Sequence, residues 1–468
     1  MRRSHCRSRQ RERVGVVPSR FDVLVVGGGP AGSIAALVLA RGGARVALVD
    51  KAKFPRDKAC GDIVGPRALR LLADLEMRAP TGRNVGEMMV VGPNGRRAQL
   101  PCGEGLTYPG HGTAVTRTVF DSMLHQVATE AGATPVYGHA VGPLECEGRI
   151  DGYRLSDGTE LRADFVIGAD GATSRVAGAA GMVDAKKVLW GFAIRTYLPQ
   201  AVDLPAIVLW ESAPWHGFPG YGWVFPGATG EANVGLGLGT VADRKAGAKV
   251  QQALPRFLEH LREVELLTDA SLSMPSRRLG GWLKMGMVGT VPAEGRVLLV
   301  GDAAGLVNPL QGEGISQAMC SGRSAAAVVL AEPGQAAERY RSRLAIDHLP
   351  YHRITAAAQG WLVGRPRAVA AVSRLAMTAG RIDALSGGWS VFWNELLDGA
   401  PPGRHRSVAA TASRLGEMMT ARTATAQWFD TTFADERIPL MCQEVDLCST
   451  GSDSRSAGAS QCRNPNLR

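Results

Sequence analysis

Apolar and polar residues follow a regular order near the start of the chain, between Phe21 and Asp50. Short continuous apolar runs alternate there with glycine-rich turns. The pattern predicts a buried strand over 23–26, a glycine turn over 27–32, a helix over 35–40 and a second strand over 46–49. This order is that of a strand–helix–strand unit in a parallel sheet.

The turn between the first strand and the helix has a GxGxxG spacing. Glycines so spaced allow a tight turn, a close approach of backbone to a pyrophosphate, and close packing of helix on strand. The helix N-terminus offers N–H groups and a partial positive charge to phosphates, and an acid at the end of the second strand can bind a ribose. The unit therefore predicts a dinucleotide site. Its candidate contacts are Gly27, Gly29, Pro30, Ala31, Gly32, Asp50 and Lys51.

The rest of the chain alternates between strand-like and helix-like periods. From about Trp190 to Leu238 the alternation is apolar and aromatic, which is typical of an antiparallel sheet with one buried face. Other expected elements are helices at 67–75, 119–131, 250–261 and 314–330, a hairpin of 88–91 with 97–100, a strand at 113–116, three strands ending with 165–167, and a strand at 297–300. Residues beyond Pro333 are helical in spacing to about Phe433.

Composition and charge narrow the class of protein. The 468 residues suffice for two joined domains. Much of the net charge of +10 lies in the first twenty residues, which lack the apolar centre of a secretory signal. We favour a disordered arm there over a nucleic-acid-binding arm, and expect no nucleic-acid partner. The eight cysteines form no CxxC pair or zinc spacing, which predicts a reduced, cytoplasmic protein without a metal site. No apolar run reaches the roughly 18 residues of a spanning helix.

Four stretches together resemble the FAD-dependent oxidoreductases with the hydroxylase-type, glutathione-reductase-like flavin fold. They are the GxGxxG unit, 115–121 with Arg117, 168–171 with Asp170, and 301–305 with Asp302. The resemblance covers about residues 21 to 330 and implies FAD as the cofactor. Asp302 would bind a ribityl hydroxyl, Arg117 a phosphate or the ribityl chain, and Asp170 would order the loop between domains. A helix N-terminus near the flavin pyrimidine edge would stabilise its reduced form. The implied contacts on this side of the cofactor are Gly301, Asp302, Gly312, Gly314 and Ile315.

Three further stretches are similar to the geranylgeranyl reductase family. They are Asp57–Asp62 with its Cys-Gly pair, Tyr221–Pro226 of the YxWxFP type, and Asn308–Ile315 of the GEGI type. The upstream proline, Pro219, stands one residue closer than usual. The resemblance implies a prenyl-substrate cavity lined by Tyr221, Trp223, Phe225 and Pro226. It also places Cys60 and Gly61 beside the flavin, and makes Cys60, Tyr221 and Trp223 the candidate catalytic residues.

Cys60 has two interpretations. A cysteine is most often an inert buried thiol. Beside two loop glycines and a basic loop, it can instead lie near the flavin with a lowered pKa. We take as a hypothesis that Cys60 donates a proton to the substrate.

The predicted function is reduction of C=C bonds in a geranylgeranyl-type chain on a lipid, quinone or related precursor, by hydride transfer from reduced FAD. The first alternative is a halogenase or monooxygenase acting on a natural product. Halogenases of this fold carry WxWxIP, from which Tyr221 and Phe225 depart. Hydroxylases read GDAAH and GQGxN, where Gly305, Glu313 and Ser316 stand here. The second alternative is a flavin-binding protein without reductase activity.

The predicted fold class is α/β, with a Rossmann-like FAD-binding domain, an antiparallel-sheet substrate domain and a helical C-terminal region. The expected divisions are an arm at 1–20, a FAD-binding domain at 21–185 and 290–335, a substrate domain at 186–289 that also receives 85–112, a helical region at 336–440 and a disordered tail at 441–468.

The expected partners follow from the resemblance. No second nucleotide motif is visible, so NADPH binds transiently or a redox protein supplies the electrons. A prenyl substrate lives in the bilayer, so we expect contact with the inner membrane surface. Arg367, Arg374 and Arg381 recur every seven residues on one helix face. A solvated face is favoured there over an interfacial helix.

Overall fold

The computed structural model describes residues 20–91, 97–101, 108–199, 206–209, 220–241, 246–269, 277–309 and 311–349, together with 352, 355, 356 and 371. The chain divides into two compact units, 1–434 and 435–468, and every described residue belongs to the first. The N-terminal arm, the C-terminal tail and the helix face with Arg367, Arg374 and Arg381 lie outside the described residues, as do the 92–96 turn and Pro219.

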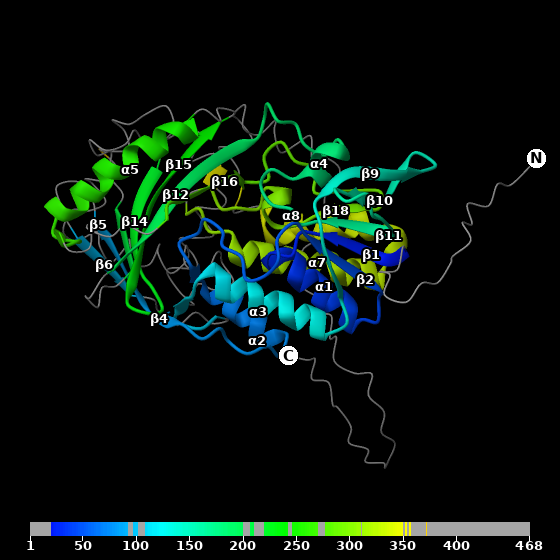
Figure 1. Cartoon of the computed structure of the whole chain (residues 1–468), viewed down its shortest axis with the longest axis horizontal. Helices are drawn as coiled ribbons and strands as arrows, with labels where there is room; N and C mark the ends of the chain where they lie inside the picture. The colour runs from blue at the N-terminus through cyan, green and yellow to red at the C-terminus, as the bar shows by residue number, and fades with distance from the viewer. Residues whose placement is uncertain are drawn as a thin grey trace, which may run out of the picture. The chain divides into compact units, whose positions relative to one another are not determined.

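An eight-stranded sheet carries the predicted strand–helix–strand unit (Figure 1). Its central order is β17-β18-β11-β1-β2-β8, and β9 and β10 extend from β11. Strand β1 pairs in parallel with β2 and with β11, as expected for buried β-branched runs. The strands are β1 (Arg20–Val26), β2 (Val46–Asp50), β8 (Thr134–Tyr137), β9 (Ala140–Cys146), β10 (Arg149–Leu155), β11 (Glu160–Gly168), β17 (Ala293–Glu294) and β18 (Val297–Leu299).

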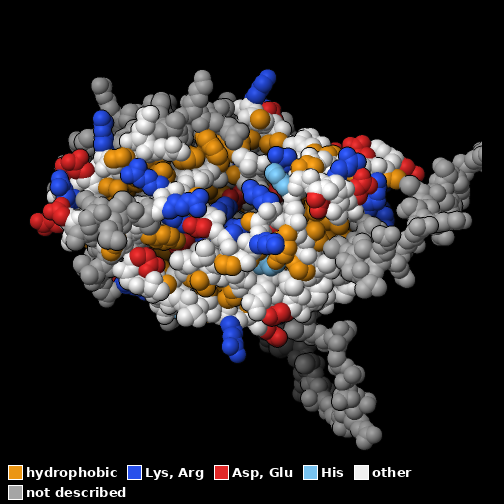
Figure 2. All heavy atoms as spheres, in the orientation of Figure 1, with side chains coloured by type: hydrophobic (Ala, Val, Ile, Leu, Met, Phe, Trp, Pro, Cys, Tyr) orange, Lys and Arg blue, Asp and Glu red, His pale blue; other side chains and the backbone are white. Residues whose placement is uncertain are grey.

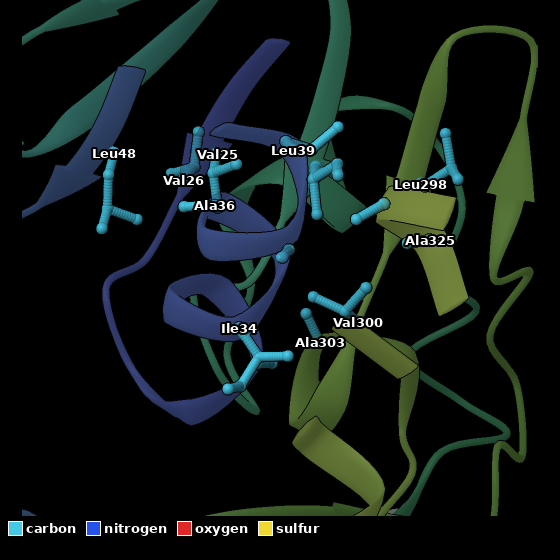
Figure 3. Packing of buried hydrophobic residues seen from close by; sticks show 14 of the residues in the cluster. Val25, Val26, Ile34, Ala36, Leu39, Leu48, Leu298, Val300, Ala303 and Ala325 are labelled. Carbon is cyan, nitrogen blue, oxygen red and sulfur yellow. The ribbon is translucent and has the colours of Figure 1, made fainter. Parts of the chain in front are cut away.

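The helices against this sheet are packed closely because small residues meet at their crossings. Helix α1 (Pro30–Arg41) makes its most extensive helix contact with α7 (Ile315–Ala331). At Gly322 a Cβ would lie 2.2 Å from the Ala31 carbonyl oxygen, so the crossing admits only glycine. Ile34 and Leu39 of α1 face Val300 and Leu298 across this core (Figure 3). The remaining helices here are α2 (Pro66–Asp74), α3 (Arg117–Glu130), α4 (Arg175–Ala179), α8 (Ala336–Asp347) and the 3-10 turns η2 (Gly301–Ala304) and η3 (Pro333–Gln335).

The second large sheet has seven strands in the order β16-β12-β15-β14-β13-β5-β6. Helix α5 (Ala246–Glu263) lies across one face of it (Figure 1). Phe192, Val224 and Leu236 bury their side chains on that face with α5. The strands are β5 (Glu87–Val91), β6 (Arg97–Pro101), β12 (Leu189–Pro199), β13 (Ala206–Leu209), β14 (Gly220–Pro226), β15 (Glu231–Val241) and β16 (Leu279–Met285).

The opposite face of this sheet is here called the Trp223 face. Residues paired across antiparallel strands point to the same side, so the register puts Trp223, Gly235 and Arg195 together on it. The sequence predicted one buried face. The structure buries side chains on both faces, since Trp223 and Arg195 are as inaccessible as the α5 side.

A three-stranded sheet of β3 (Ile63–Val64), β7 (Gly112–Ala114) and β4 (Arg83–Val85) joins the two larger sheets in sequence. Most predicted elements occur within a few residues of their expected bounds. Four strands, not three, follow α3, because β8 was not anticipated. Strand β13 also pairs in parallel with β5, so the seven-stranded sheet is not wholly antiparallel.

Within the described part of the chain, no helix combines the length and hydrophobicity that crossing a bilayer requires. The same residues contain no cluster of histidine, cysteine and acidic side chains suited to a metal ion.

Candidate active site

The glycine turn between β1 and α1 is shaped for close approach. Gly27 has a φ of +111°, and a Cβ there would lie 2.2 Å from the Ala169 carbonyl oxygen. A Cβ at Gly32 would lie 1.8 Å from the Gly27 carbonyl oxygen. A Cβ placed on Gly29 would have one described neighbour within 4 Å, an Arg56 guanidinium nitrogen at 3.3 Å. The first turn of α1, with Pro30 and Ala31, has no acidic side chain. This cradle fits a phosphate group, since its backbone is open where a phosphate must approach.

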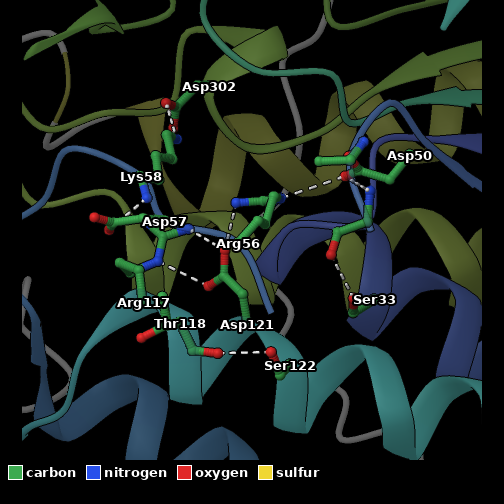
Figure 4. A network of polar contacts seen from close by, with 12 residues as sticks. Ser33, Asp50, Arg56, Asp57, Lys58, Arg117, Thr118, Asp121, Ser122 and Asp302 are labelled. Atoms are coloured by element: carbon green, nitrogen blue, oxygen red, sulfur yellow. Dashed lines mark hydrogen bonds and ion pairs between the residues drawn. The ribbon is translucent and has the colours of Figure 1, made fainter. Parts of the chain in front are cut away.

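Asp50 holds the turn from the end of β2. Its carboxylate accepts hydrogen bonds from Gly28 N at 2.8 Å and Ala52 N at 2.9 Å. Arg56 Nε lies 3.7 Å from the same carboxylate (Figure 4). Asp50 thus orders the cradle, and its ribose contact stays a prediction. Lys51 is exposed, and its cofactor contact also stays a prediction.

Arg117 is buried in an ion-pair network (Figure 4). Its Nε and Nη2 donate to the two carboxylate oxygens of Asp121, each at 2.7 Å. Arg56 Nη1 reaches the same carboxylate at 3.0 Å. These bonds leave Arg117 as a structural anchor between Asp121 and Cys60, while Arg56 lies beside Gly29. Arg56 is therefore the better-placed phosphate ligand, and the phosphate or ribityl role of Arg117 stays a prediction.

The second cofactor loop begins at η2. Gly301 and Gly312 both have positive φ, at +56° and +69°, a region that favours glycine. Asp302 pairs with Lys58 at 3.0 Å (Figure 4), so the Cys60 segment already meets this loop. Gly314 caps α7 and Ile315 begins it. Glu313 Oε1 accepts a hydrogen bond from Ser316 N at 2.9 Å, which occupies one of the free donors of the helix.

Asp170 caps the short helix α4 instead of facing open space. Its carboxylate accepts from Ser174 Oγ at 2.5 Å and from Arg175 N at 2.6 Å. This agrees with a role in ordering the loop after β11. Nearby, burial lowers the pKa of Lys284 to about 8, although the negative charges of Asp170 and Asp302 act to raise this pKa.

The aromatic residues of β14 meet both cofactor loops. The Tyr221 hydroxyl donates to the Gln311 carbonyl oxygen and lies 3.2 Å from a Cβ placed on Gly312. A Cβ on Gly61 would lie 2.8 Å from Phe225, so the Cys60–Gly61 turn packs directly on the aromatic row. Trp223 is buried, and Pro226 ends the strand.

A row of small residues crosses the Trp223 face beside Tyr221. Tyr221 pairs with Gly237, which pairs with Ala193, and Ala193 pairs with Gly281. A Cβ on Gly237 would meet nothing closer than 3.8 Å. The row therefore presents no side chain larger than a methyl group next to the aromatic side chains, and at Gly281 a Cβ would lie 3.2 Å from the Ala59 Cβ.

Burial raises the pKa of the Cys60 thiol, and the nearby Arg117 guanidinium offsets only part of this effect. The lowered pKa expected for this residue is wrong. The loss of hydration on burial destabilises the thiolate by more than the Arg117 charge stabilises it. Cys60 is a neutral thiol at ordinary pH. A neutral thiol can still give up a proton, although it is a poor nucleophile.

Asp62 lies two residues from Cys60 and is buried in a polar cluster. Asn233 Nδ2 donates to Asp62 Oδ2 at 2.8 Å and to the Cys60 carbonyl oxygen at 2.8 Å. The Tyr197 hydroxyl donates to the same Asp62 oxygen, and Trp223 Nε1 donates to Asn233 Oδ1 at 2.9 Å. Burial raises the pKa of Asp62 to about 6, against the hydrogen bonds from Tyr197 and Asn233, which lower it.

Sequence reasoning missed several residues of this site. Asp62 lay in the Asp57–Asp62 stretch without an assigned role, and Arg56 and Lys58 lay in the basic loop beside Cys60. Asn233, Tyr197 and Arg195 carried no signal beyond being polar in apolar strands. A buried polar residue on a strand face needs a partner, which is the one hint available. Figure 2 shows basic side chains gathered around a hollow on the face in view.

The comparisons with known proteins agree with this geometry. The profile of the "FAD binding domain" family matches residues 20–339. The menaquinone reductase of Mycolicibacterium smegmatis is 36% identical over 315 residues, 66% of this chain and 76% of that one. The digeranylgeranylglycerophospholipid reductase 2 of Methanopyrus kandleri is 34% identical over 316 residues, again 66% and 76%.

Solved structures show the fold. A geranylgeranyl bacteriochlorophyll reductase-like protein from Thermoplasma acidophilum has a TM-score of 0.64 at 23% identity, over 86% of this chain and 99% of that one. A flavin-dependent halogenase has a TM-score of 0.58 at 19% identity, over 87% and 78%. The predicted α/β flavin fold and the FAD cofactor are confirmed. The chain belongs to the FAD-binding domain family and is an FAD-dependent oxidoreductase of the geranylgeranyl reductase-like kind.

Proposed function

We propose that this protein reduces C=C bonds in the prenyl chain of a lipid, quinone or related precursor. One observation carries the proposal: the aromatic row of β14 and the small-residue row beside it adjoin Cys60 and the Gly312 loop. An extended chain of branched hydrocarbon matches such a surface, because it offers only apolar contacts and needs a narrow, dry space. The relatives named as reductases of menaquinone and of digeranylgeranylglycerophospholipids support this substrate class.

FAD, when bound and reduced, supplies the hydride of this reaction. The residues of the chain bind the cofactor, exclude water and hold a proton. The Gly27–Gly32 turn and Arg56 fit its phosphates, and Asp302 its ribityl chain. Tyr221 and Trp223 close the apolar side. The neutral thiol of Cys60 holds a proton at Sγ for the second carbon of the double bond.

The electron donor and the membrane contact belong to the same proposal. The sequence shows one GxGxxG motif, at 27–32, and we assign it to FAD. We therefore infer that NADPH binds transiently or that a redox protein delivers the electrons. Delivery of a bilayer substrate requires contact with the membrane surface, and we expect the protein to bind vesicles that contain it.

One observation weighs against the halogenase alternative. Halogenation requires a lysine that projects toward the substrate. Within the described strands of the seven-stranded sheet the only lysine is Lys284. It pairs with Trp190 on the sheet face opposite Trp223, and its charge interacts with Asp170 and Asp302 of the cofactor loops. Lys58 is engaged with Asp302.

The test is anaerobic turnover followed by mass spectrometry. The FAD-loaded protein is reduced with dithionite and mixed with menaquinone or with digeranylgeranylglycerophospholipid in detergent. A mass gain of two hydrogens per reduced bond is the expected result. Incorporation of oxygen or halide under air, without saturation, would overturn the proposal. Unchanged substrate, with the flavin fully reduced, would favour the protein that binds flavin without reductase activity.

A further inference from the structure

The carboxyl of Asp62 is unusual in three respects. It is buried at 4% exposure, and its backbone has a φ of +63°, uncommon for a residue with a side chain. Its two oxygens are also treated differently. Oδ2 accepts from both Tyr197 and Asn233, while Oδ1 is buried without a hydrogen-bond partner among the described residues. A buried carboxylate oxygen without a partner is costly, and such costs persist mainly where function needs them.

The unequal oxygens fix where a proton would reside. Because Oδ2 already accepts two hydrogen bonds, a neutral Asp62 carries its proton on Oδ1. The same residue contacts Cys60 through its backbone, since Asp62 N donates to Cys60 Sγ at 3.3 Å. The proton of Oδ1 thus belongs to the residue in contact with the thiol.

The titratable groups that face Asp62 come from β12, α3 and its own turn. Tyr197 and Arg195 approach from β12, Arg117 from α3, and Cys60 from its own turn. Arg195 is itself paired with Asp57, at 2.6 Å to each oxygen. Arg117 is paired with Asp121. Because each arginine is paired with another carboxylate, it stabilises the Asp62 anion only weakly. Burial is therefore the largest effect on the pKa of Asp62.

We propose that Asp62 is a second proton-holding group of the site, which returns a proton to Cys60 after each reduction. This rests on the proposed function and on Cys60 as the donor. In the reduction the Cys60 S–H bond breaks and a C–H bond forms on the carbon that did not receive the hydride. The Asp62 O–H bond then breaks and the S–H bond reforms. The resulting carboxylate is held by the Tyr197 hydroxyl and the Asn233 amide until it takes a proton from water.

Kinetics with Asp62→Asn separate this role from a structural one. The first turnover starts with a protonated Cys60, so its rate in a single-turnover experiment should fall far less than the steady-state rate. Steady-state turnover should fall by roughly 10²-fold, the scale of a positioned acid or base, at unchanged KM. Equal losses in both experiments, or no loss in either, would overturn the proposal.

Tyr197→Phe tests the same proton through its pH dependence. Loss of the Tyr197 hydrogen bond raises the pKa of Asp62 further, because that bond lowers it. In the wild type, steady-state turnover should decrease as pH rises through the pKa of Asp62. In Tyr197→Phe the midpoint of this decrease should lie at a higher pH. Tyr153→Phe is the matched control, since Tyr153 is a buried tyrosine whose hydroxyl has no described partner. A shift of the same size in both variants, or in neither, would contradict the role of Asp62.

Thiol titration needs no substrate and so separates this inference from the proposed function. The rate of alkylation of Cys60 is followed against pH on the tryptic peptide from Ala59 to Arg67, which holds no other cysteine. The Asp62 charge raises the pKa of Cys60, so Asp62→Asn should move the midpoint to lower pH. An unmoved midpoint would refute the coupling. A moved midpoint in a protein that saturates no prenyl chain would leave the coupling standing and overturn the proposed substrate instead.

Discussion

The buried pair Arg117–Asp121 offers the sharpest test of how this site is held together. We consider Asp121→Asn, which keeps the shape of the side chain and removes its charge. Two arginines then lose their carboxylate, because Arg56 Nη1 also contacts Asp121 at 3.0 Å. Asp121 is fully buried and Arg117 is 4% exposed.

The magnitude follows from burial. Breaking one side of a buried pair leaves an uncompensated charge and costs about 3–5 kcal/mol. The chain supplies a matched exposed pair in Arg70–Asp74, which has the same i,i+4 spacing and the same 2.7 Å distance. Its side chains are 53% and 32% exposed, and such helix pairs are worth only about 0.3–0.5 kcal/mol. We therefore expect Asp121→Asn to cost several times more than Asp74→Asn.

The assay is urea unfolding of both variants, followed by circular dichroism at low and at high salt. The small effect of Asp74→Asn should shrink further in 1 M salt, whereas that of Asp121→Asn should persist because ions do not screen a buried pair. The double variant Arg117→Met with Asp121→Leu should recover part of the loss. If Asp121→Asn costs no more than Asp74→Asn, the assignment of a buried anchor is wrong.

Three further outcomes are expected. Arg56→Met should weaken FAD binding by roughly tenfold, the loss of one charge-assisted hydrogen bond, measured by fluorescence titration of the apoprotein with FAD. Gly237→Leu should abolish turnover of prenyl substrate and retain bound FAD, because it fills the small-residue row. Gly142→Leu, at a glycine of β9 where a Cβ would meet nothing within 4 Å, should leave both intact. Relative to the wild type, Asp62→Asn should have a more favourable effect on the free energy of unfolding at pH 8 than at pH 4. The wild-type acid, with its pKa raised to about 6, stabilises the fold fully below about pH 4 and loses that contribution as pH rises through 6. This loss is on the order of 3 kcal/mol and is measured by urea unfolding at the two pH values.

The cofactor half of the fold could be predicted because its signals are local. The strand at Val23–Val26, the glycine turn and the strand that ends at Asp50 lie within thirty residues, and each element reads from its own period. The parallel pairing of β1 with β11, which sets Val23 opposite Phe165, was not predicted. Lys58 and Asp302 likewise form an ion pair across 244 residues, which no local pattern encodes.

The substrate half could be predicted only in part. Alternation identified the sheet, and the family resemblance singled out Tyr221, Trp223 and Phe225, but neither reveals what lies above that face of the sheet. Asn233 joins Cys60 and Trp223 from a strand that is glycine and apolar from Val234 to Gly239. Its bonds span 173 residues to Cys60 and only 10 to Trp223. The pKa of Cys60 was mispredicted for the same reason, because burial depends on distant strands.

These contacts explain why a costly carboxyl can persist beside Cys60. Asn233 uses its amide oxygen for Trp223 and its amide nitrogen for Cys60 and Asp62, so it fixes the aromatic row and the proton-bearing turn with one side chain. A leucine at position 62 would be cheaper to bury, but it would leave the Tyr197 hydroxyl and one Asn233 donor bond without their acceptor. The hydrogen bonds of the cluster therefore depend on one another. Oδ1 of Asp62, the carboxyl oxygen without a hydrogen-bond partner among the described residues, is the atom on which a proton can be exchanged. A buried carboxyl contributes less folding stability here than an apolar side chain would. In exchange, the site keeps a group that can hold a proton next to an apolar surface.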